Sequence, residues 1–442
     1  MSDLLAPYEP GRDGPFGLEE AAHLLRRAAF GAPLVQVREW QALGPGECIR
    51  RLFLDEEGEE ASALDRTADA LSELNQLRMI QALWLMRMKV SKCPALEKLA
   101  LFWHNHFATS HVKVQSAELL WRQYRLLRSK GQGSFEVLLQ EISRDPAMLI
   151  WLDSNSNRST HPNENYAREL MELFSLGVGS YSERDVQEAA RAFTGWHERG
   201  GEFRFNERVH DFGEKQIFGR QGDFDGDDVV RMCVGHPACA RFLAKKLLQF
   251  YVEPDPGSDL VEDLAQCLRD LGFDLSMVLK CLLQSKAFFS ERARRSIVKS
   301  PVDLCIGAVQ TLELSADFKA LADRTRELGQ SLFAPPSVKG WDGQRRWISS
   351  HSLLLRQRFA AAVSWESEGL SSLPWKRWSA ADSQDSRARV AELILEVQQG
   401  GLKEDCRSRL TEFTEQNQGM GEEAVLRSLT QLLLALPEYQ LC

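Results

Sequence analysis

The residues of this sequence best suited to chemistry gather in one segment, Pro162 to Trp196, which reads PNENYARELMELFSLGVGSYSERDVQEAARAFTGW. Within it, Asn165, Glu169 and Glu172 follow the i, i+4 and i+7 spacing that places side chains on one side of a helix. Carboxylates one turn apart repel each other unless water, a cation or a metal ion compensates their charge. The spacing therefore allows two interpretations, a solvated polar face or the lining of an internal polar site.

Local ion pairs favour the solvated face. Arg168 lies at the edge of the polar stripe and can reach Glu164 and Glu172 at i,i+4 spacing. Charged helix faces are solvated more often than they are functional.

Polar residues in other parts of the chain favour the internal site. His104 precedes the central segment, and the pair His210–Asp211 follows it. Two histidines and carboxylates from separate segments could ligate a divalent metal ion with open coordination positions. The same groups could perform acid–base catalysis without a metal, with a Glu as base and a His as acid. A third possibility is a buried polar network with a structural role.

The predicted site residues fall into three groups. We expect catalytic roles for Glu169, His104, His210 and Asp211. We expect substrate binding by Asn163, Asn165, Arg168, Glu172, Arg191, Lys215 and Trp341. The candidate metal ligands are His104, His210 and Glu169, and the identity of any metal stays open. For Trp341, packing of its loop onto the protein body is the alternative to a stacking surface.

The histidines of the sequence WHNHFATSH differ in their expected surroundings. His104 and His106 lie two residues apart, so on a helix their side chains point about 200° apart and cannot chelate one ion together. His106 falls on the side of Leu99 and Phe102 and is predicted to be a core histidine. His104 falls in line with Glu97, which makes it the better functional candidate of the two, although a buried structural hydrogen bond is favoured slightly over a catalytic role.

Capping signals define the elements that must position the central residues. A first helix is predicted from Asn163 to Leu176, followed by Gly177 and Gly179, which supply positive φ at its end. Ser182, with an acidic residue three positions later, predicts the start of a second helix. Alternation around 203–217 predicts a short β-hairpin, and 64–90 is expected to form one long helix.

Composition excludes several classes of function. The chain has 442 residues with a net charge of −9, so no global basic field favours nucleic acid or an anionic membrane. No apolar run approaches the roughly 20 residues of a spanning helix, and the N-terminus lacks the features of a signal peptide. The nine cysteines are scattered and free of CxxC spacing, so disulfides are not expected. We expect a cytoplasmic protein.

The helical period dominates the chain and predicts a mainly α fold. We expect one large multi-helix globular domain over residues 1–366, with the short β-hairpin as an insertion. A stretch rich in Ser, Trp and Asp predicts a linker at 367–387. Residues 388–442 then predict a small C-terminal appendage of three helices.

Several long motifs in one order resemble a large, mainly bacterial family known as domain of unknown function 1800. The motifs are Trp103 to Ser110, Pro162 to Gly179, Tyr181 to Trp196, His210 to Lys215, and Pro335 to Gly343. The resemblance extends from about His23 to Arg356. It implies no established activity, but members are often encoded beside a second family with a sulfatase-like or phosphatase-like fold.

These observations favour a hydrolase-like enzyme, metal-dependent or acid–base, over a non-catalytic scaffold or partner of the co-encoded protein. The two hypotheses differ in geometry. An enzyme needs the polar groups to converge on a partly open site, whereas a scaffold needs them saturated by one another. For the enzyme we expect a carboxylate oxygen of Glu169 within about 8 Å of a ring nitrogen of His104 or His210.

Overall fold

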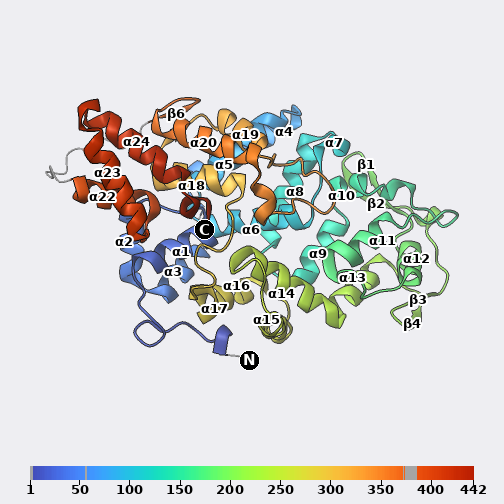
Figure 1. Ribbon diagram of the computed structural model, residues 1–442. Helices are drawn as coiled ribbons and strands as arrows, with labels where there is room; N and C mark the ends of the chain where they lie inside the picture. The colour runs from blue at the N-terminus through green and yellow to red at the C-terminus, as the bar shows by residue number, and fades with distance from the viewer. Residues whose placement is uncertain (1–2, 55–56, 372, 374–385) are drawn as a thin grey trace.

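Helices dominate the computed structural model, which describes residues 3–54, 57–371, 373 and 386–442 (Figure 1). Within these ranges the only sheets are three antiparallel pairs of short strands. The predicted mainly α fold is therefore confirmed. Every helix in the described part of the chain is too short or too polar to cross a membrane.

The first part of the chain forms ten helices in the described residues. They are α1 (Leu18–Ala28), α2 (Leu34–Leu43), α3 (Pro45–Leu52), α4 (Glu59–Glu73), α5 (Leu77–Val90), α6 (Pro94–His106), α7 (His111–Val114), α8 (Ala117–Lys130), α9 (Phe135–Ser143) and α10 (Pro146–Trp151).

The rest of the chain begins with the central segment. Its helices are α11 (Asn165–Glu169), α12 (Glu183–Ala192), α13 (Gly226–Gly235), α14 (Pro237–Tyr251), α15 (Ser258–Asp270), α16 (Leu275–Gln284), α17 (Lys286–Phe289), α18 (Pro301–Thr311), α19 (Phe318–Glu327), α20 (Ser350–Ser364), α22 (Ser386–Gln398), α23 (Glu404–Gln416) and α24 (Glu422–Ala435). Its strands are β1 (Trp196–Arg199), β2 (Glu202–Phe205), β3 (Lys215–Ile217), β4 (Arg220–Gly222), β5 (Ser315–Ala316) and β6 (Leu370–Ser371).

The long helix expected at 64–90 is two helices, α4 and α5, and that expectation was wrong. The chain turns at Asn75, whose φ is 54°. Asparagine tolerates this left-handed conformation better than most residues. Its side chain also fixes the turn, since Oδ1 accepts the Ala117 N–H at 2.7 Å and Nδ2 donates to the Gln115 carbonyl at 3.2 Å.

The hairpin expected near 203–217 is two hairpins. β1 pairs with β2 and β3 pairs with β4, so the predicted range holds the second strand of one hairpin and the first strand of the next. The first turn contains Gly200 and Gly201, with φ of 65° and 78°. Two consecutive positive φ values suit a tight hairpin turn, and glycine adopts them without strain. A third pair, β5 with β6, joins distant parts of the chain.

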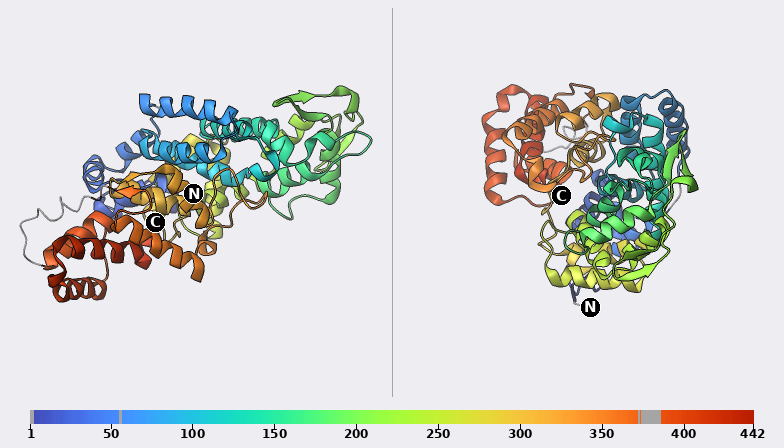
Figure 2. Two further views of the ribbon diagram at one scale, coloured as in Figure 1. Left: turned by 90° about the horizontal axis from the view of Figure 1, so that it is seen from above. Right: turned by 90° about the vertical axis from the view of Figure 1, so that its right-hand side faces the viewer.

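Helix α6 lies between two hydrophobic cores. Leu99, Phe102 and Trp103 belong to a core shared with α9, the central segment and α13–α17. Ala100 and Leu101 belong to a second core, shared with α5, α8, α18 and α20. The two hairpins lie at one end of the molecule and the C-terminal helices at the other, with α5, α6 and α8 between them (Figures 1 and 2).

The C-terminal part forms three helices, α22 to α24, as expected for residues 388–442. Their apolar side chains belong to the same buried cluster as those of α18 and α20. Most of the predicted linker at 367–387 lies outside the described residues, except for 367–371, 373 and the start of α22. The division into a main domain, a linker and an appendage stays a prediction.

Candidate functional site

The central segment begins as an α-helix and continues as a π-helix. α11 passes at Leu170 into a π-helical stretch, Leu170–Ser175, in which the Leu176 N–H bonds to the Met171 carbonyl at 2.9 Å. π-Helical turns leave carbonyl groups without their usual partners and are frequent at functional sites. α12 then starts as predicted, with Ser182 and Asp185 forming a reciprocal capping box.

The end of α6 binds two other segments through three consecutive side chains. His104 Nε2 accepts the Phe333 N–H at 3.0 Å, and Asn105 Oδ1 accepts the Trp341 N–H at 2.7 Å. His106 Nε2 lies 3.0 Å from the Phe174 carbonyl, to which it must donate. The expectation that His106 is a core histidine is therefore confirmed. This helix end fixes the central segment and the loop of the Pro335–Gly343 motif in place.

His104 is buried among aromatic rings rather than at an open surface. Its ring centroid lies 5.2 Å from that of Trp84, 5.4 Å from that of Phe333 and 5.7 Å from that of Trp341. Burial lowers the pKa of His104 to about 3, so the ring is neutral at physiological pH. A neutral ring agrees with Nε2 as a hydrogen-bond acceptor, and this lone pair is occupied by the Phe333 backbone.

Four predicted site residues meet at the hairpin end of the molecule. Every side-chain nitrogen of Arg191 donates: Nε and Nη2 to the two oxygens of Asp211 at 2.7 and 3.3 Å, and Nη1 to Glu188 at 2.8 Å. The Arg191 guanidinium lowers the pKa of Asp211. Lys215 is buried, and its ammonium donates to the Gly213 carbonyl at 2.9 Å.

His210 belongs to the same network through Thr194. Its Nδ1 lies 2.6 Å from the Thr194 carbonyl and must donate to it. The Thr194 hydroxyl accepts the Asp211 N–H at 2.8 Å and lies 2.6 Å from the Arg191 carbonyl. The ring of His210 lies between Phe205 and Phe212, with centroids 5.1 and 4.6 Å away. Arg191, Asp211 and His210 Nδ1 are thus bound to one another, to Glu188 or to the backbone, whereas His210 Nε2 has no hydrogen-bond partner among the described residues.

The polar stripe of the central helix is only partly engaged. Arg168 binds Glu164 at 2.9 Å and Glu183 at 2.7 Å, and the Tyr181 hydroxyl donates to Glu172 at 3.0 Å. The local ion pairs expected for a solvated face are therefore present in part, although Arg168 binds Glu183 in place of Glu172.

Two asparagines hold the start of α11. The Asn163 side chain accepts the Asn165 N–H at 2.9 Å and donates to the Ser156 hydroxyl at 2.6 Å. The Asn165 amide reaches Asp153 at 3.5 Å. Both residues thus tie the helix to the preceding polar loop.

Glu169 differs from its neighbours because it has no partner. It is half-buried, and among the described residues no hydrogen bond or ion pair involves its carboxylate. Burial raises the pKa of Glu169, and the nearby charge of Glu172 raises it further. No hydrogen bond joins it to His104 or His210 in that part of the chain, so their convergence within about 8 Å stays a prediction. The described residues contain no group of three or more His, Cys, Asp or Glu arranged to hold a metal ion.

A small cavity beside α6 is lined by several residues that the sequence analysis did not identify. It has a volume of about 90 Å³ and is lined by Arg27, Lys98, Asn105, Asp303 and Trp341, among others. Lys98 and Asp303 form a buried ion pair there. Arg27 is 1% exposed, and its Nε has no hydrogen-bond partner among the described residues.

The sequence motifs pointed to two residues of this cavity, whereas the helical pattern pointed to none. Trp341 was a candidate, and Asn105 lies in the WHNHF motif, but Arg27, Lys98 and Asp303 occupy ordinary amphipathic helices. Helical periodicity identifies a buried face without showing which buried positions border a cavity.

A family model described as protein of unknown function (DUF1800) matches residues 23–441, nearly the whole chain. No curated protein and no solved structure shows significant similarity to the chain.

Proposed function

Since the chain belongs to the DUF1800 family, whose description names no activity, we propose from its geometry that it is a non-catalytic scaffold that binds a partner protein. One observation carries the proposal: the polar groups at the hairpin end are engaged with one another. This is the arrangement expected of a scaffold. It reverses our preference from the sequence, which was for an enzyme.

Few polar atoms of this network remain free to bind a substrate. A catalytic acid, base or binding group must be able to exchange its hydrogen bonds for bonds to the substrate. Arg191 already uses all its nitrogens, and both oxygens of Asp211 are bound. A fully satisfied buried network instead makes a structure rigid. His104, with Nε2 bound to a backbone amide, fits the same interpretation.

The surface above this network supports a protein–protein contact. Phe205 is 45% exposed and Phe212 is 61% exposed, and both pack on the ring of His210. Exposed aromatic side chains on a rigid base are typical interface anchors.

A broad groove beside these rings carries basic side chains. Its volume is about 960 Å³, and its lining includes four arginines, Arg158, Arg199, Arg204 and Arg208, against two carboxylates, Glu198 and Glu202, of which Glu202 binds Arg122. None of these four arginines forms a salt bridge within the described residues, so the groove complements an acidic protein surface. We assign this surface to the co-encoded protein of sulfatase-like or phosphatase-like fold that the family resemblance implies.

The test is a binding measurement between this protein and the purified co-encoded protein. We expect Arg204→Glu to weaken binding about tenfold or more, the scale of a charge reversal at an interface, and to reduce its salt dependence. The matched control is Arg184→Glu, an exposed arginine of α12 outside the groove, which should leave the affinity unchanged. Equal affinities for the wild type and both variants, or no binding at all, would overturn the proposal.

A second candidate function rests on Glu169. A half-buried carboxylate with a raised pKa and no partner is a candidate general base. The test is a screen of hydrolase substrates with the wild type and Glu169→Gln. We expect this substitution to abolish any activity found and to change stability by no more than about 1 kcal/mol. Leu170→Ala, at a fully buried position, should cost roughly 2–5 kcal/mol.

The metal-dependent form of the enzyme hypothesis has its own test. Metal analysis of protein purified without a chelating tag should show a stoichiometric divalent ion if this form is correct. The substitution of His104, His210 or Glu169 should then lower the metal content.

A cytoplasmic location also stays a proposal. What supports it is the state of the thiols: all nine cysteines are free in the structure. Titration of denatured, unreduced protein should find nine thiols, and two or more stable disulfides would contradict a reducing compartment.

A further inference from the structure

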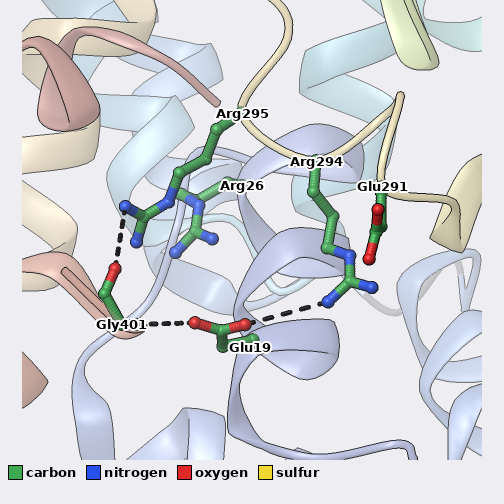
Figure 3. A pocket seen from close by; sticks show the side chains of 6 residues that line it. All are labelled: Glu19, Arg26, Glu291, Arg294, Arg295 and Gly401. Carbon is green, nitrogen blue, oxygen red and sulfur yellow. Dashed lines mark hydrogen bonds and ion pairs between the residues drawn. The ribbon is translucent and has the colours of Figure 1, made fainter. Parts of the chain in front are cut away.

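Two arginines that form no salt bridge within the described residues, Arg26 and Arg295, lie where the C-terminal helices meet the N-terminal helix. Arg26 comes from α1, Arg295 from the segment between α17 and α18, and Gly401 from the loop after α22. They line a cavity of about 260 Å³ together with Glu19, Glu291 and Arg294 (Figure 3). In this view the guanidinium groups of Arg26 and Arg295 lie side by side.

The hydrogen bonds of these two arginines are few and long. Arg26 donates to the Gln398 carbonyl at 3.5 Å, and Arg295 donates to the same carbonyl at 3.3 Å and to the Gly401 carbonyl at 3.4 Å. Within the described residues neither forms a salt bridge. Arg294 shows the usual alternative, since it binds Glu20 at 2.8 Å.

The like charges of Arg26 and Arg295 oppose each other at a half-buried place. Burial and, second, the charge of Arg295 together lower the pKa of Arg26 to about 10. Lys299 lies in an adjoining small cavity that Arg26 and Arg295 also line. Its ammonium has a ring face as a neighbour, 3.6 Å from the centroid of Tyr439.

The nearby carboxylates offset the charge of this cluster only in part, since Glu19 acts on both arginines and Glu438 on Arg295 without an ion pair to either among the described residues. Glu19 contributes one oxygen to the Gly401 N–H at 2.5 Å, and its other oxygen is 3.7 Å from Arg294. Glu291 and Glu438 border the two cavities without a salt bridge to Arg26 or Arg295 in the described chain. Cations held together with reduced access to water require an anion, because their desolvation is otherwise uncompensated.

We propose that Arg26 and Arg295 bind a small tetrahedral dianion of the phosphate or sulfate type, free or as the terminal group of a monoester. Planar guanidinium groups match the oxygens of such anions in a bidentate fashion. The cavity exceeds the size of one such ion, which leaves room for a short organic substituent. A bound anion would link α1 to the loop at Gly401 and so fix the C-terminal helices to the main body. This site is independent of the proposed scaffold surface at the other end of the molecule.

The first experiment measures binding to the full-length protein by calorimetry and by thermal unfolding. The probes are inorganic phosphate, inorganic sulfate and O-phosphoserine, with chloride at matched ionic strength as the reference. We expect saturable one-site binding of phosphate or sulfate with a rise in unfolding temperature. Tighter binding of phosphoserine than of phosphate would identify a monoester as the ligand, and the reverse would identify the free ion. No effect beyond that of chloride overturns the proposal.

Substitutions that remove a positive or a negative charge from the cavity should change anion binding in opposite directions. Arg26→Gln and Arg295→Gln should each weaken binding by roughly tenfold to a hundredfold, the equivalent of one charged hydrogen-bonding group. Glu19→Gln should strengthen binding severalfold, because glutamine can still accept the Gly401 N–H but removes a negative charge from the cavity. A structural role alone would not produce this gain.

The matched control is Arg292→Gln. Arg292 lies in the same segment as Arg295, but it is exposed and binds Glu253 at 2.8 Å outside the cavity. We expect it to leave anion binding unchanged. Without anion, Arg295→Gln should be at least as stable as the wild type, because it removes the repulsion with Arg26. If Arg26→Gln does not fold, Arg295→Gln and Glu19→Gln carry the test, and unchanged binding in both contradicts the assignment.

Discussion

We predict that Glu97→Gln, in α6, strongly destabilises the fold although it changes neither the size nor the shape of the side chain. The Glu97 carboxylate is 0% exposed and accepts from four donors. Oε1 accepts from Nε of Arg87 at 2.8 Å and from Nε of Arg128 at 2.6 Å. Oε2 accepts from Nε1 of Trp84 at 3.1 Å and from the Tyr124 hydroxyl at 2.8 Å.

The loss of stability depends on which of these four hydrogen bonds a glutamine side chain can still accept. Its single carbonyl oxygen must face the two arginines, since guanidinium groups only donate. Its amide group then faces Trp84, another donor, while the Tyr124 hydroxyl can turn and accept. One hydrogen bond is therefore lost, and Arg87 and Arg128 lose a buried counter-charge.

Breaking a buried ion pair costs roughly 3–5 kcal/mol. Both arginines keep Glu57 as a second partner, which places our expectation at the lower limit, about 3 kcal/mol. The assay is urea unfolding followed by circular dichroism, in which the midpoint should fall at an unchanged slope. The control is Glu57→Gln. Glu57 binds the same arginines, but its side chain is 28% exposed, so this substitution should cost about 1 kcal/mol or less. A loss for Glu97→Gln no larger than that of Glu57→Gln would refute the reasoning.

Three further predictions concern single residues. Gly340→Ala should lower the free energy of unfolding in urea by about 2 kcal/mol or more, because φ is 81° and a Cβ would lie 2.3 Å from an oxygen of Asn105 in α6. The control, Gly11→Ala, has φ of 88° but no atom within 4 Å of its Cβ, so it should cost clearly less. Equal losses would exclude the clash as the cause. Burial lowers the pKa of Lys299 to about 7. Between pH 7 and roughly pH 10 the unfolded chain therefore binds more protons than the folded chain, and stability rises with pH. Lys299→Met should flatten this rise in anion-free buffer, and an unchanged slope would contradict the lowered pKa. A hydrogen bond from the Cys267 thiol lowers the pKa of Cys281, so Cys281 should be the thiol that iodoacetamide alkylates fastest at neutral pH, and Cys267→Ala should remove that preference.

Local patterns in the sequence identified what local physics controls. The 3.6-residue period predicted the helices, and Ser182 with Asp185 predicted the start of α12 because a capping box needs only residues three positions apart. Gly177 and Gly179 have the positive φ expected after the first central helix. The same period placed His106 on the side of Leu99 and Phe102, where the structure has it.

Long-range packing decided which polar side chains meet. His104 and Glu97 do lie in line on α6, as the period predicted, but His104 binds the backbone of Phe333, which lies 229 residues away in the sequence. Glu97 instead holds two arginines of neighbouring helices. A helical pattern shows which side of a helix a residue occupies, and it contains no information about what packs against that side.

The candidate sites show the same division. The stripe of Asn165, Glu169 and Glu172 was visible in the sequence because its members share one helix. The cationic cluster of Arg26 and Arg295 was not visible, since its members come from segments far apart in the chain and each is unremarkable in its own helix or loop. Only the tertiary structure brings such charges together, because the apolar cores, and not the charges, determine how the helices pack.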